Sequence, residues 1–222
     1  MTCVSDEKPG GRRSVEDVRV FLIGGAPGVG KTTLGVALAA RLGIAAVTVD
    51  DLLTVAQTVT THESHPGLHA MRRVGHLEYF THSTLEQLQN DTEQQHRAVW
   101  PLVRELVRKR AQWAPSRIVI DGWHLRPRHV AAMGLEHVWS GWVVTSPSVL
   151  EARERRNATW THGSADPERM LANFVARSLW FNELVRAEAA EFEMNVLYQD
   201  GTATVDDLCT AVLTTGSGNR LE

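Results

Sequence analysis

Short runs of apolar residues alternate along the chain with longer segments in which apolar residues recur at helical spacing. The runs predict five buried strands, at 18–23, 44–49, 117–120, 138–145 and 194–198. Helices are expected at 33–42, over a long polar region at about 52–113 that a Pro-Gly loop near 60–67 interrupts, after Ser146-Pro147, at 168–190 and after Thr204. Strands that alternate with helices form right-handed βαβ units. The predicted fold is therefore α/β, with a five-stranded parallel sheet that helices cover on both faces.

A glycine-rich loop stands between the first predicted strand and the first predicted helix. Residues 25–32 read Gly-Ala-Pro-Gly-Val-Gly-Lys-Thr and match the P-loop, or Walker A, pattern G-x-x-x-x-G-K-[ST]. Its glycines let backbone N–H groups turn toward phosphate oxygens, and the start of the helix adds the positive end of its dipole. The pattern predicts a three-layer P-loop NTPase fold with these nucleotide contacts: Gly25, Ala26, Pro27, Gly28, Val29, Gly30, Lys31, Thr32 and Thr33. Lys31 is expected to reach the β- and γ-phosphates, and the Thr32 hydroxyl to bind Mg²⁺.

Composition limits the classes of protein to which the chain can belong. Its 222 residues suit one domain, expected at 18–214 between a disordered tail at 1–17 and a loose end at 215–222. The net charge of −3 gives no electrostatic footprint for nucleic acid. The two cysteines, Cys3 and Cys209, do not make a disulfide framework. The sequence has neither an apolar run of about 18 residues nor the apolar core of a signal peptide, so we expect a cytoplasmic protein without a membrane partner.

Asp121 follows the short apolar strand at 117–120 and is the candidate for a second acid directed at Mg²⁺. Beside the P-loop strand, its carboxylate would hold the metal through water. The alternative is a strand-end aspartate that caps the next turn together with Gly122. The chain lacks the Asn-Lys-x-Asp motif of GTPases and the ABC transporter signature, and it is too short for a AAA+ module with its helical lid. Small-molecule kinases remain, and they need an acid near the accepting hydroxyl and an arginine lid.

An acidic pair follows the second predicted strand. Asp50 and Asp51 stand where the strand tip faces the γ-phosphate in this fold. One of the two carboxylates can therefore orient the acceptor hydroxyl and take its proton. Alternatively, Asp51 only caps the following helix. Both aspartates are candidate catalytic residues.

Arginines cluster where a small helical lid is expected. Arg153-Glu-Arg155-Arg156 precede the loop 157–166, and the predicted lid spans about 153–169. Planar guanidinium groups hold the oxygens of a transferred phosphoryl group, and closure of a mobile segment excludes water that would hydrolyse ATP. Arg153 and Arg156 are the predicted catalytic members, and Arg153 is also expected to bind the nucleotide. The competing interpretation is a solvated helix with Glu–Arg pairs.

Together these segments resemble a known group of enzymes. GGAPGVGKTT, TVDDLL, IDGWHLRP, the R-x-R-R start of the lid and the N-F-x-x-R segment at 173–177 are similar to bacterial P-loop small-molecule kinases, namely 2-phosphoglycerate kinase and, more loosely, chloramphenicol phosphotransferase. The resemblance extends from about Val18 to Leu213. It implies that the base is Asp51 by the first family and Asp50 by the second. In the first family an acidic residue, Gly, an apolar residue and His follow the third strand, as 121–124 do here, with Trp123 replacing a smaller apolar residue.

We therefore predict an ATP- and Mg²⁺-dependent kinase that acts on a hydroxyl of a small metabolite or natural product. The region at about 52–113 is expected to cover the acceptor. Besides Asp51, the residues expected to bind the acceptor are Arg72, Arg73, Trp123, His124 and Arg126. The arginines favour an anionic acceptor, whereas Trp123 and the likeness to an antibiotic kinase favour a neutral, partly apolar one.

Two other classes of protein remain. A regulatory or non-catalytic P-loop protein that hydrolyses ATP slowly would need neither the aspartate pair nor the lid arginines. A kinase that acts on nucleic-acid ends is disfavoured by the acidic balance of the chain. His62, His65 and His69 are spaced closely enough for a metal site, but their loop has no accompanying Cys, which favours polar surface over zinc.

Overall fold

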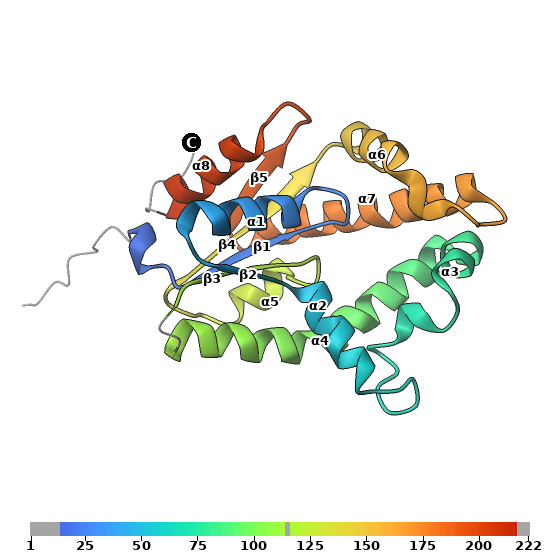
Figure 1. The fold of residues 1–222 in the computed structure, drawn as a ribbon, viewed down its shortest axis with the longest axis horizontal. Coiled ribbons are helices and arrows are strands. Elements are labelled where there is room, and N and C mark those ends of the chain that lie inside the picture. The colour runs from blue at the N-terminus through green and yellow to red at the C-terminus, as the bar shows by residue number, and fades with distance from the viewer. Residues whose placement is uncertain (1–13, 114–115, 217–222) are drawn as a thin grey trace, which may run out of the picture.

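The computed structural model describes residues 14–113 and 116–216 of the chain. Within these residues, five parallel strands form one sheet in the order β2-β3-β1-β4-β5 (Figure 1). The strands are β1 Val20–Gly25, β2 Ala45–Thr48, β3 Ile118–Asp121, β4 Val138–Thr145 and β5 Asn195–Gln199. The predicted parallel sheet is confirmed. β4 has the predicted bounds, and the other strands begin and end within two residues of theirs.

Helices cover both faces of the sheet (Figure 1). They are α1 Lys31–Leu42, α2 Val49–Thr58, α3 His76–His82, α4 Leu85–Trp113, α5 Pro127–Ala131, α6 Pro147–Arg156, α7 Pro167–Glu191 and α8 Val205–Gly216, with 3-10 turns η1 Val15–Asp17, η2 Ala70–Arg72 and η3 Ala158–Thr161. α1 and α8 pack on one face, and α4 and α7 lie on the other, with α5 against α7. As predicted, Ser146 and Asp166 cap α6 and α7, and proline follows each of them.

Both ends of the described chain are more regular than predicted. η1 replaces the last part of the expected disordered tail, because Ser14 caps it and Arg117 donates a hydrogen bond to its first carbonyl oxygen at 2.7 Å. At the other end α8 continues to Gly216, so the first residues of the predicted loose end are helical. The remainder of both tails, with Cys3, lies outside the described residues.

The core lies on both sides of the central strand β1. Residues 20–23 have no exposed surface, as expected for a strand with a neighbour on each side and helices on each face. Trp142 on β4 is also fully buried, and its indole N–H donates to the carbonyl oxygen of Leu125 at 2.7 Å. In the part of the chain that the structure describes, no helix is long and apolar enough to cross a membrane.

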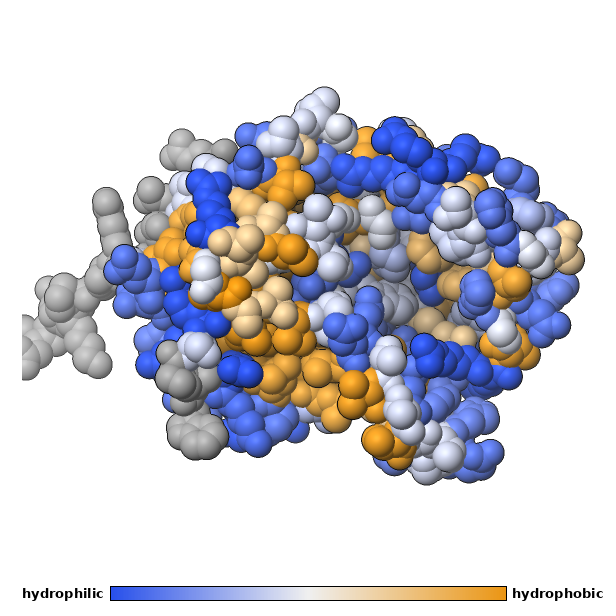
Figure 2. Space-filling view, in the orientation of Figure 1, coloured by the Kyte–Doolittle hydropathy of each residue, from blue (hydrophilic) through white to orange (hydrophobic). Residues whose placement is uncertain are grey.

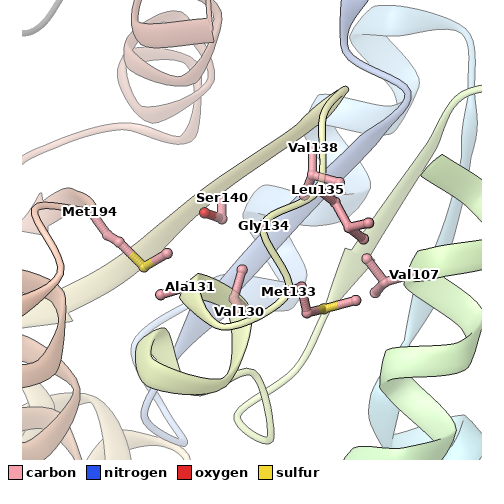
Figure 3. A pocket seen from close by; sticks show the side chains of 9 residues that line it. All are labelled: Val107, Val130, Ala131, Met133, Gly134, Leu135, Val138, Ser140 and Met194. Carbon is pink, nitrogen blue, oxygen red and sulfur yellow. The ribbon is translucent and has the colours of Figure 1, made fainter. Parts of the chain in front are cut away.

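Apolar surface and an apolar cavity lie outside this core. Figure 2 shows apolar residues gathered on the face that carries α1, β2 and α2. Val36 on α1 and Val55 on α2 are exposed. A cavity of about 200 Å³ lies between α4, α5 and β4, lined among others by Val107, Val138 and Met194 (Figure 3). Because Val138 opens β4 and Met194 precedes β5, this cavity lies at the amino ends of the strands. The P-loop lies at the opposite edge of the sheet.

Candidate active site

The P-loop connects the carboxyl end of β1 to the first turn of α1. Gly25, Gly28 and Gly30 have φ angles of 139°, 82° and 97°, which residues with a side chain rarely adopt. Gly30 is the N-cap of α1 and offers no side-chain cap. The first N–H groups of α1 therefore remain available to an anion, and the positive end of the helix dipole points the same way.

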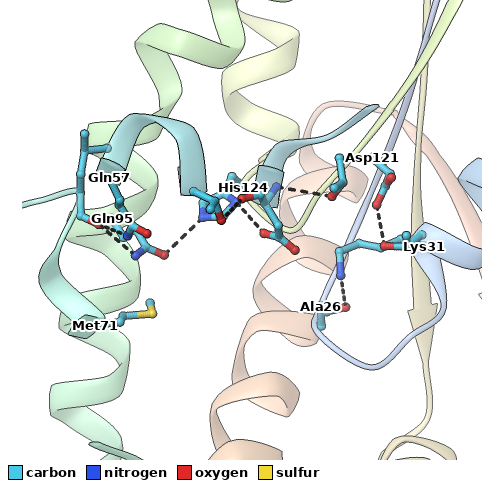
Figure 4. Close-up of polar contacts among 12 residues, drawn as sticks. Ala26, Lys31, Gln57, Met71, Gln95, Asp121 and His124 are labelled. Carbon is cyan, nitrogen blue, oxygen red and sulfur yellow. Dashed lines mark hydrogen bonds and ion pairs between the residues drawn. The ribbon is translucent and has the colours of Figure 1, made fainter. Parts of the chain in front are cut away.

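Lys31 is the buried cation of this loop. Its side chain is 8 % exposed, and Nζ donates to the carbonyl oxygen of Ala26 at 3.3 Å. Burial lowers the pKa of Lys31, whereas the negative charges of Asp50 and Asp121 raise it. Lys31 forms no ion pair within 4 Å in the described parts of the chain. Its ammonium is therefore positioned for an anion that the protein itself does not supply (Figure 4).

Thr32 and Asp121 bring two oxygens together beside the P-loop. The Thr32 hydroxyl donates to Oδ1 of Asp121 at 2.7 Å, because β1 and β3 are neighbours and Ile23 is in register with Asp121. Burial raises the pKa of Asp121, and hydrogen bonds from Thr32 and Thr48 oppose that rise. In the turn after β3 the backbone N–H of Leu125 donates to the carbonyl oxygen of Gly122 at 3.3 Å. Among the described residues, the hydrogen bonds of the Asp121 carboxylate come from Thr32 and Thr48 and not from this turn, so the alternative in which Asp121 caps the turn finds no support.

A hydroxyl and a carboxylate are oxygen ligands of the kind that Mg²⁺ prefers. The pair also has the second feature that a Mg²⁺ site needs, a buried acid whose charge is incompletely matched. Within residues 14–113 and 116–216, no group of three or more His, Cys, Asp or Glu side chains is arranged to hold a metal ion. A cation at Thr32 and Asp121 would thus take its remaining ligands from water and from phosphate oxygens, which is how Mg²⁺ binds with nucleotides.

Asp50 and Asp51 lie on the first turn of α2, because β2 ends one residue earlier than predicted. Thr48 is the N-cap, and its hydroxyl accepts a hydrogen bond from the backbone N–H of Asp50 at 3.4 Å. The predicted alternative, in which Asp51 caps the helix, is therefore wrong. Successive residues of a helix point about 100° apart, so the two carboxylates face different surroundings.

Asp50 faces the P-loop and the end of β3. Its Oδ1 lies 3.7 Å from Nδ1 of His124, and the side chain of Trp123 donates a hydrogen bond to its carboxylate. Partial burial raises the pKa of Asp50, Lys31 lowers it, and the neighbouring Asp51 raises it again. The Asp50 side chain nevertheless remains 56 % exposed, so an incoming molecule can reach it. Asp51 is exposed, and within the described residues its side chain forms no hydrogen bond or ion pair with this group. The charge of Asp50, and not that of Asp51, thus acts on the pKa values of Lys31 and Asp121.

The predicted acceptor residues are placed in three different ways. Trp123 and His124 lie directly behind Asp50 and are 8 % and 0 % exposed. Arg72 and Arg73 are exposed at and after η2. Arg126 is fully buried on the far side, where it pairs with Glu188 and, at 2.8 Å, with Glu93. This differs from the predicted anion-binding role of Arg126, because two carboxylates already neutralise its guanidinium.

Arg177 on α7 is the arginine that the structure brings toward the pocket instead. It is 4 % exposed, and its guanidinium carbon lies 4.8 Å, 4.9 Å and 5.0 Å from the ring centres of Phe80, Trp123 and Phe174. Its Nε has no hydrogen-bond partner, and no carboxylate within 4 Å pairs with it among the described residues. Burial lowers the pKa of Arg177 to about 10. The sequence predicted Arg177 only as an arginine that follows the lid, within the N-F-x-x-R segment of the resemblance, and not as a residue that binds the acceptor.

The arginines of α6 divide between the P-loop and solvent. Arg153 donates to the carbonyl oxygen of Val29 at 3.1 Å. Arg153 and Arg156 line a cavity of about 320 Å³ beside the P-loop, closed on its other side by α8 and the end of β5. Arg155 points away and pairs on the surface with Glu151 and Glu168. The competing interpretation of a solvated helix with Glu–Arg pairs describes Arg155, whereas Arg153 contacts the P-loop.

Glu154 is a residue that the sequence analysis did not single out. It is 8 % exposed, and a side chain at Gly28 would collide with its carboxylate. Burial raises the pKa of Glu154, while Lys31 and Arg177 lower it. This acid therefore shares the field of the two cations that face the pocket. Its spacing in the Arg153-Glu-Arg155 run gave no signal, because only the tertiary contact with the P-loop distinguishes it from a surface glutamate.

The segment predicted as a lid loop, 157–166, contains η3 and rests on two helices. The Trp160 ring lies 4.8 Å from Phe174 on α7 and 6.1 Å from Phe80 on α3. The hydroxyls of Thr81 and Ser164 are 2.8 Å apart. The same aromatic residues also surround Arg177, so the lid segment and the buried cation share one set of contacts.

We expect Trp160→Ala to accelerate amide hydrogen exchange across 157–166 by about 10-fold, because the lost ring contacts are worth roughly one kcal/mol or more in local opening. Trp160→Phe keeps a ring and should exchange nearly as the wild type does. Hydrogen exchange measured by mass spectrometry compares the two variants. Unchanged exchange in Trp160→Ala would show that the aromatic contacts do not hold the segment.

No family model and no curated protein sequence matches the chain. Solved structures do. The chain is similar to a shikimate kinase from Aquifex aeolicus, with a TM-score of 0.50, 14% identity, and 90% of this chain and 96% of that chain covered. For a shikimate kinase from Acinetobacter baumannii in complex with shikimate, the TM-score is 0.50 at 15% identity, and the match covers 92% of this chain and 96% of that chain. For an unliganded sugar kinase from Janibacter sp. HTCC2649, the TM-score is 0.51 at 16% identity, and the match covers 89% of this chain and 93% of that chain.

These likenesses extend over most of each chain at low sequence identity, so they concern the fold. The narrower resemblance to 2-phosphoglycerate kinase and chloramphenicol phosphotransferase stays a prediction from the sequence motifs. The chain has the α/β P-loop fold found in small-molecule kinases.

Proposed function

We propose that this chain is a kinase, a phosphotransferase that moves the γ-phosphate of ATP to a hydroxyl of a small molecule. One observation carries the proposal: the Asp50 carboxylate is electrostatically coupled to Lys31 and to Asp121, which accepts a hydrogen bond from Thr32, where β1, β2 and β3 end. A protein that only binds a nucleotide has no use for an accessible acid at that point. The similar structures, two shikimate kinases and a sugar kinase, agree with a small-molecule acceptor.

The nucleotide is held by the P-loop and by α6. Backbone N–H groups of residues 28–33 surround the phosphates, and the Lys31 ammonium binds the β- and γ-phosphate oxygens. Arg153 and Arg156 line the adjoining cavity and hold phosphoryl oxygens as charge develops on them. Thr32 and Asp121 are the residues that would hold Mg²⁺, which when bound neutralises phosphate charge.

Asp50 is the proposed general base. It orients the acceptor hydroxyl and accepts its proton as the acceptor oxygen bonds to the γ-phosphorus and the bond from that phosphorus to the β,γ-bridging oxygen breaks. The hydrogen bond from Trp123 fixes the carboxylate, and its partial exposure leaves it open to the acceptor. Asp51 points elsewhere, so the proposal follows the register of chloramphenicol phosphotransferase rather than that of 2-phosphoglycerate kinase.

The acceptor is proposed to carry an anionic group, phosphate or carboxylate, beside its hydroxyl. Arg177 supports this, since a buried guanidinium without a counter-ion is costly unless an anion joins it. Phe80, Trp123 and Phe174 around it leave its planar edge as the polar part of an otherwise aromatic enclosure. This arrangement accommodates both features weighed from the sequence, an anion and an apolar wall.

A screen for ATP consumption against phosphorylated acids, sugar acids, neutral sugars, nucleosides and antibiotics tests the proposal. We expect Mg²⁺-dependent turnover with an anionic acceptor. Arg177→Gln should raise the KM of that acceptor by about 10- to 100-fold, because a charge-assisted hydrogen bond is worth about 1.5–3 kcal/mol. Arg108→Gln is the matched control on the surface of α4, where the guanidinium pairs with Glu105, and should leave KM unchanged.

Two results would contradict these assignments separately. Preferred turnover of a neutral acceptor, with the same KM in Arg177→Gln, would remove the anion from the proposal but keep the kinase. Slow hydrolysis of ATP that no acceptor accelerates would remove the kinase and leave the regulatory P-loop protein.

A further inference from the structure

A chain of polar groups runs from the backbone of Leu68 through Gln95 on α4 and His124 to Asp50. Figure 4 labels Gln95 and His124 in the middle of this chain. The chain of polar groups begins at the carbonyl oxygen of Leu68, which accepts hydrogen bonds from Nε2 of Gln57 at 2.6 Å and from Nε2 of Gln95 at 3.4 Å. Oε1 of Gln95 then lies 3.3 Å from Nε2 of His124. Nδ1 of His124 lies 3.7 Å from Oδ1 of Asp50. Gln57, Gln95 and His124 are all buried.

The direction of these bonds follows from elementary chemistry. A backbone carbonyl oxygen can only accept, so Gln95 must turn its NH₂ group toward Leu68. Its carbonyl oxygen is left facing His124, and that oxygen can also only accept. The proton of the neutral imidazole is therefore on Nε2, and Nδ1 carries a lone pair. Burial and the cations Lys31 and Arg177 keep the ring neutral, lowering the pKa of His124 to about 3.

The lone pair on Nδ1 has no hydrogen-bond partner in the structure. The ring that carries it cannot turn away, because it packs against His96 at 4.7 Å and Trp123 at 5.0 Å between ring centres. Among the described acidic side chains, only that of Asp50 lies within 4 Å of Nδ1. When ionised, the Asp50 carboxylate has no proton to donate, so the two acceptors stay apart at 3.7 Å. A proton on Asp50 would turn this gap into a hydrogen bond.

We propose that His124 is a positioning residue that acts through Asp50: locked by Gln95 as the Nε2–H tautomer, it receives a hydrogen bond from the Asp50 carboxyl once that group has taken the acceptor's proton. The inference rests on the proposed function, and it changes the predicted role of His124 from substrate contact to support of the base. The proton leaves the acceptor oxygen as its bond to phosphorus forms, stays on Asp50 and is shared with Nδ1, and returns to water after the product departs.

Other charged groups face this pair and set the background against which it works. Lys31 on α1, Asp51 on α2 and Asp121 on β3 act on the carboxylate, and Arg177 on α7 acts on the imidazole. None of these groups forms an ion pair with Asp50 within 4 Å. Among the described residues, His124 is the only such partner of the Asp50 carboxylate, and its Nδ1 is the atom that can accept a proton from it.

The tautomer is measured first, on wild-type protein without nucleotide or acceptor. Long-range ¹H–¹⁵N correlation spectra distinguish Nε2–H from Nδ1–H imidazole, and His124→Phe identifies the signal of this ring. We expect the Nε2–H pattern at pH 7. In Gln95→Leu the lock is lost and the Nδ1–H form should appear, whereas Gln57→Leu, which shares the Leu68 carbonyl but does not contact the ring, should leave the pattern unchanged. An Nδ1–H or doubly protonated ring in the wild type overturns the proposal.

Kinetics with the acceptor found in the screen test the role itself. His124→Phe keeps the ring packing but removes the lone pair, and kcat should fall about 10-fold with both KM values unchanged. His124→Asn restores an acceptor oxygen close to the position of Nδ1 and should recover most of that loss. Unchanged kcat in His124→Phe, or a rise in acceptor KM with constant kcat, overturns the proposal. Because the tautomer is read without turnover, failure of the kinase assignment and failure of the His124 assignment are seen in different experiments.

Discussion

Lys31→Ala is expected to abolish phosphoryl transfer, with a loss of at least about 100-fold in kcat/KM. The ammonium is buried at the P-loop, and one hydrogen bond to the Ala26 carbonyl is its only bond there. Its charge is thus reserved for phosphate oxygens, on which negative charge shifts during transfer.

The fold should survive this change, since Lys31 forms no ion pair that the described structure depends on. Thermal unfolding followed by circular dichroism tests whether the Lys31→Ala protein keeps its fold. Initial rates of ADP release test whether it has lost phosphoryl transfer. Lys109→Ala is the matched control, because this exposed lysine on α4 pairs only with Glu105 on the surface. A folded Lys31→Ala protein with near-normal turnover would show that the loop does not bind the transferred phosphate.

Asp50→Asn is expected to lower kcat by about 100- to 10,000-fold while ATP still binds, as loss of a general base does. Asp51→Asn should stay within about 3-fold of wild type, since its carboxylate is exposed and outside the group formed by Lys31, Asp121 and Trp123. The two variants are a matched pair with the same change on adjacent residues. Titration calorimetry with a non-hydrolysable ATP analogue measures binding, and steady-state rates measure kcat.

A reversed result, with the large loss at Asp51, would restore the register implied by 2-phosphoglycerate kinase. Equal and mild losses would leave no base among the two. Asp50→Asn also removes a negative charge that raises the pKa of Lys31. Binding of the analogue therefore needs to be compared at two pH values, so that an uncharged Lys31 is not mistaken for loss of the base.

Local sequence patterns were sufficient for the strands and the longer helices, but they did not predict α5 or the break between α3 and α4. The inner strands β1, β3 and β4 are short apolar runs because helices cover both of their faces, whereas the edge strands β2 and β5 keep exposed residues. Proline after a capping residue marks the start of α6 and α7. The start of α2 was misplaced by extending β2 to Val49. The signal was present, since Thr48 followed by two acids is a typical helix start.

The acceptor side could not be read in the same way, because it depends on which charges meet in space. Arg126 and Arg177 look alike in sequence, but Glu188 and Glu93 reach only the first. Arg177 is left among aromatic rings from three separate segments, with no carboxylate beside it in the described chain. The periodic pattern of a sequence predicts contacts within one helix or strand, but it does not predict which residues from separate segments come close together.

The strand that carries the P-loop is made long before its neighbours. Val20 pairs with Ile118 on one side and with Val138 on the other. At about 5–20 residues per second, a ribosome needs on the order of ten seconds to supply those partners. During that interval an entirely apolar strand leaves the ribosome with both edges open, which is the kind of segment that aggregates or recruits a chaperone. Nucleotide can therefore assist folding only in the last stage of synthesis, once β3 and β4 have joined β1 and the loop has its final shape.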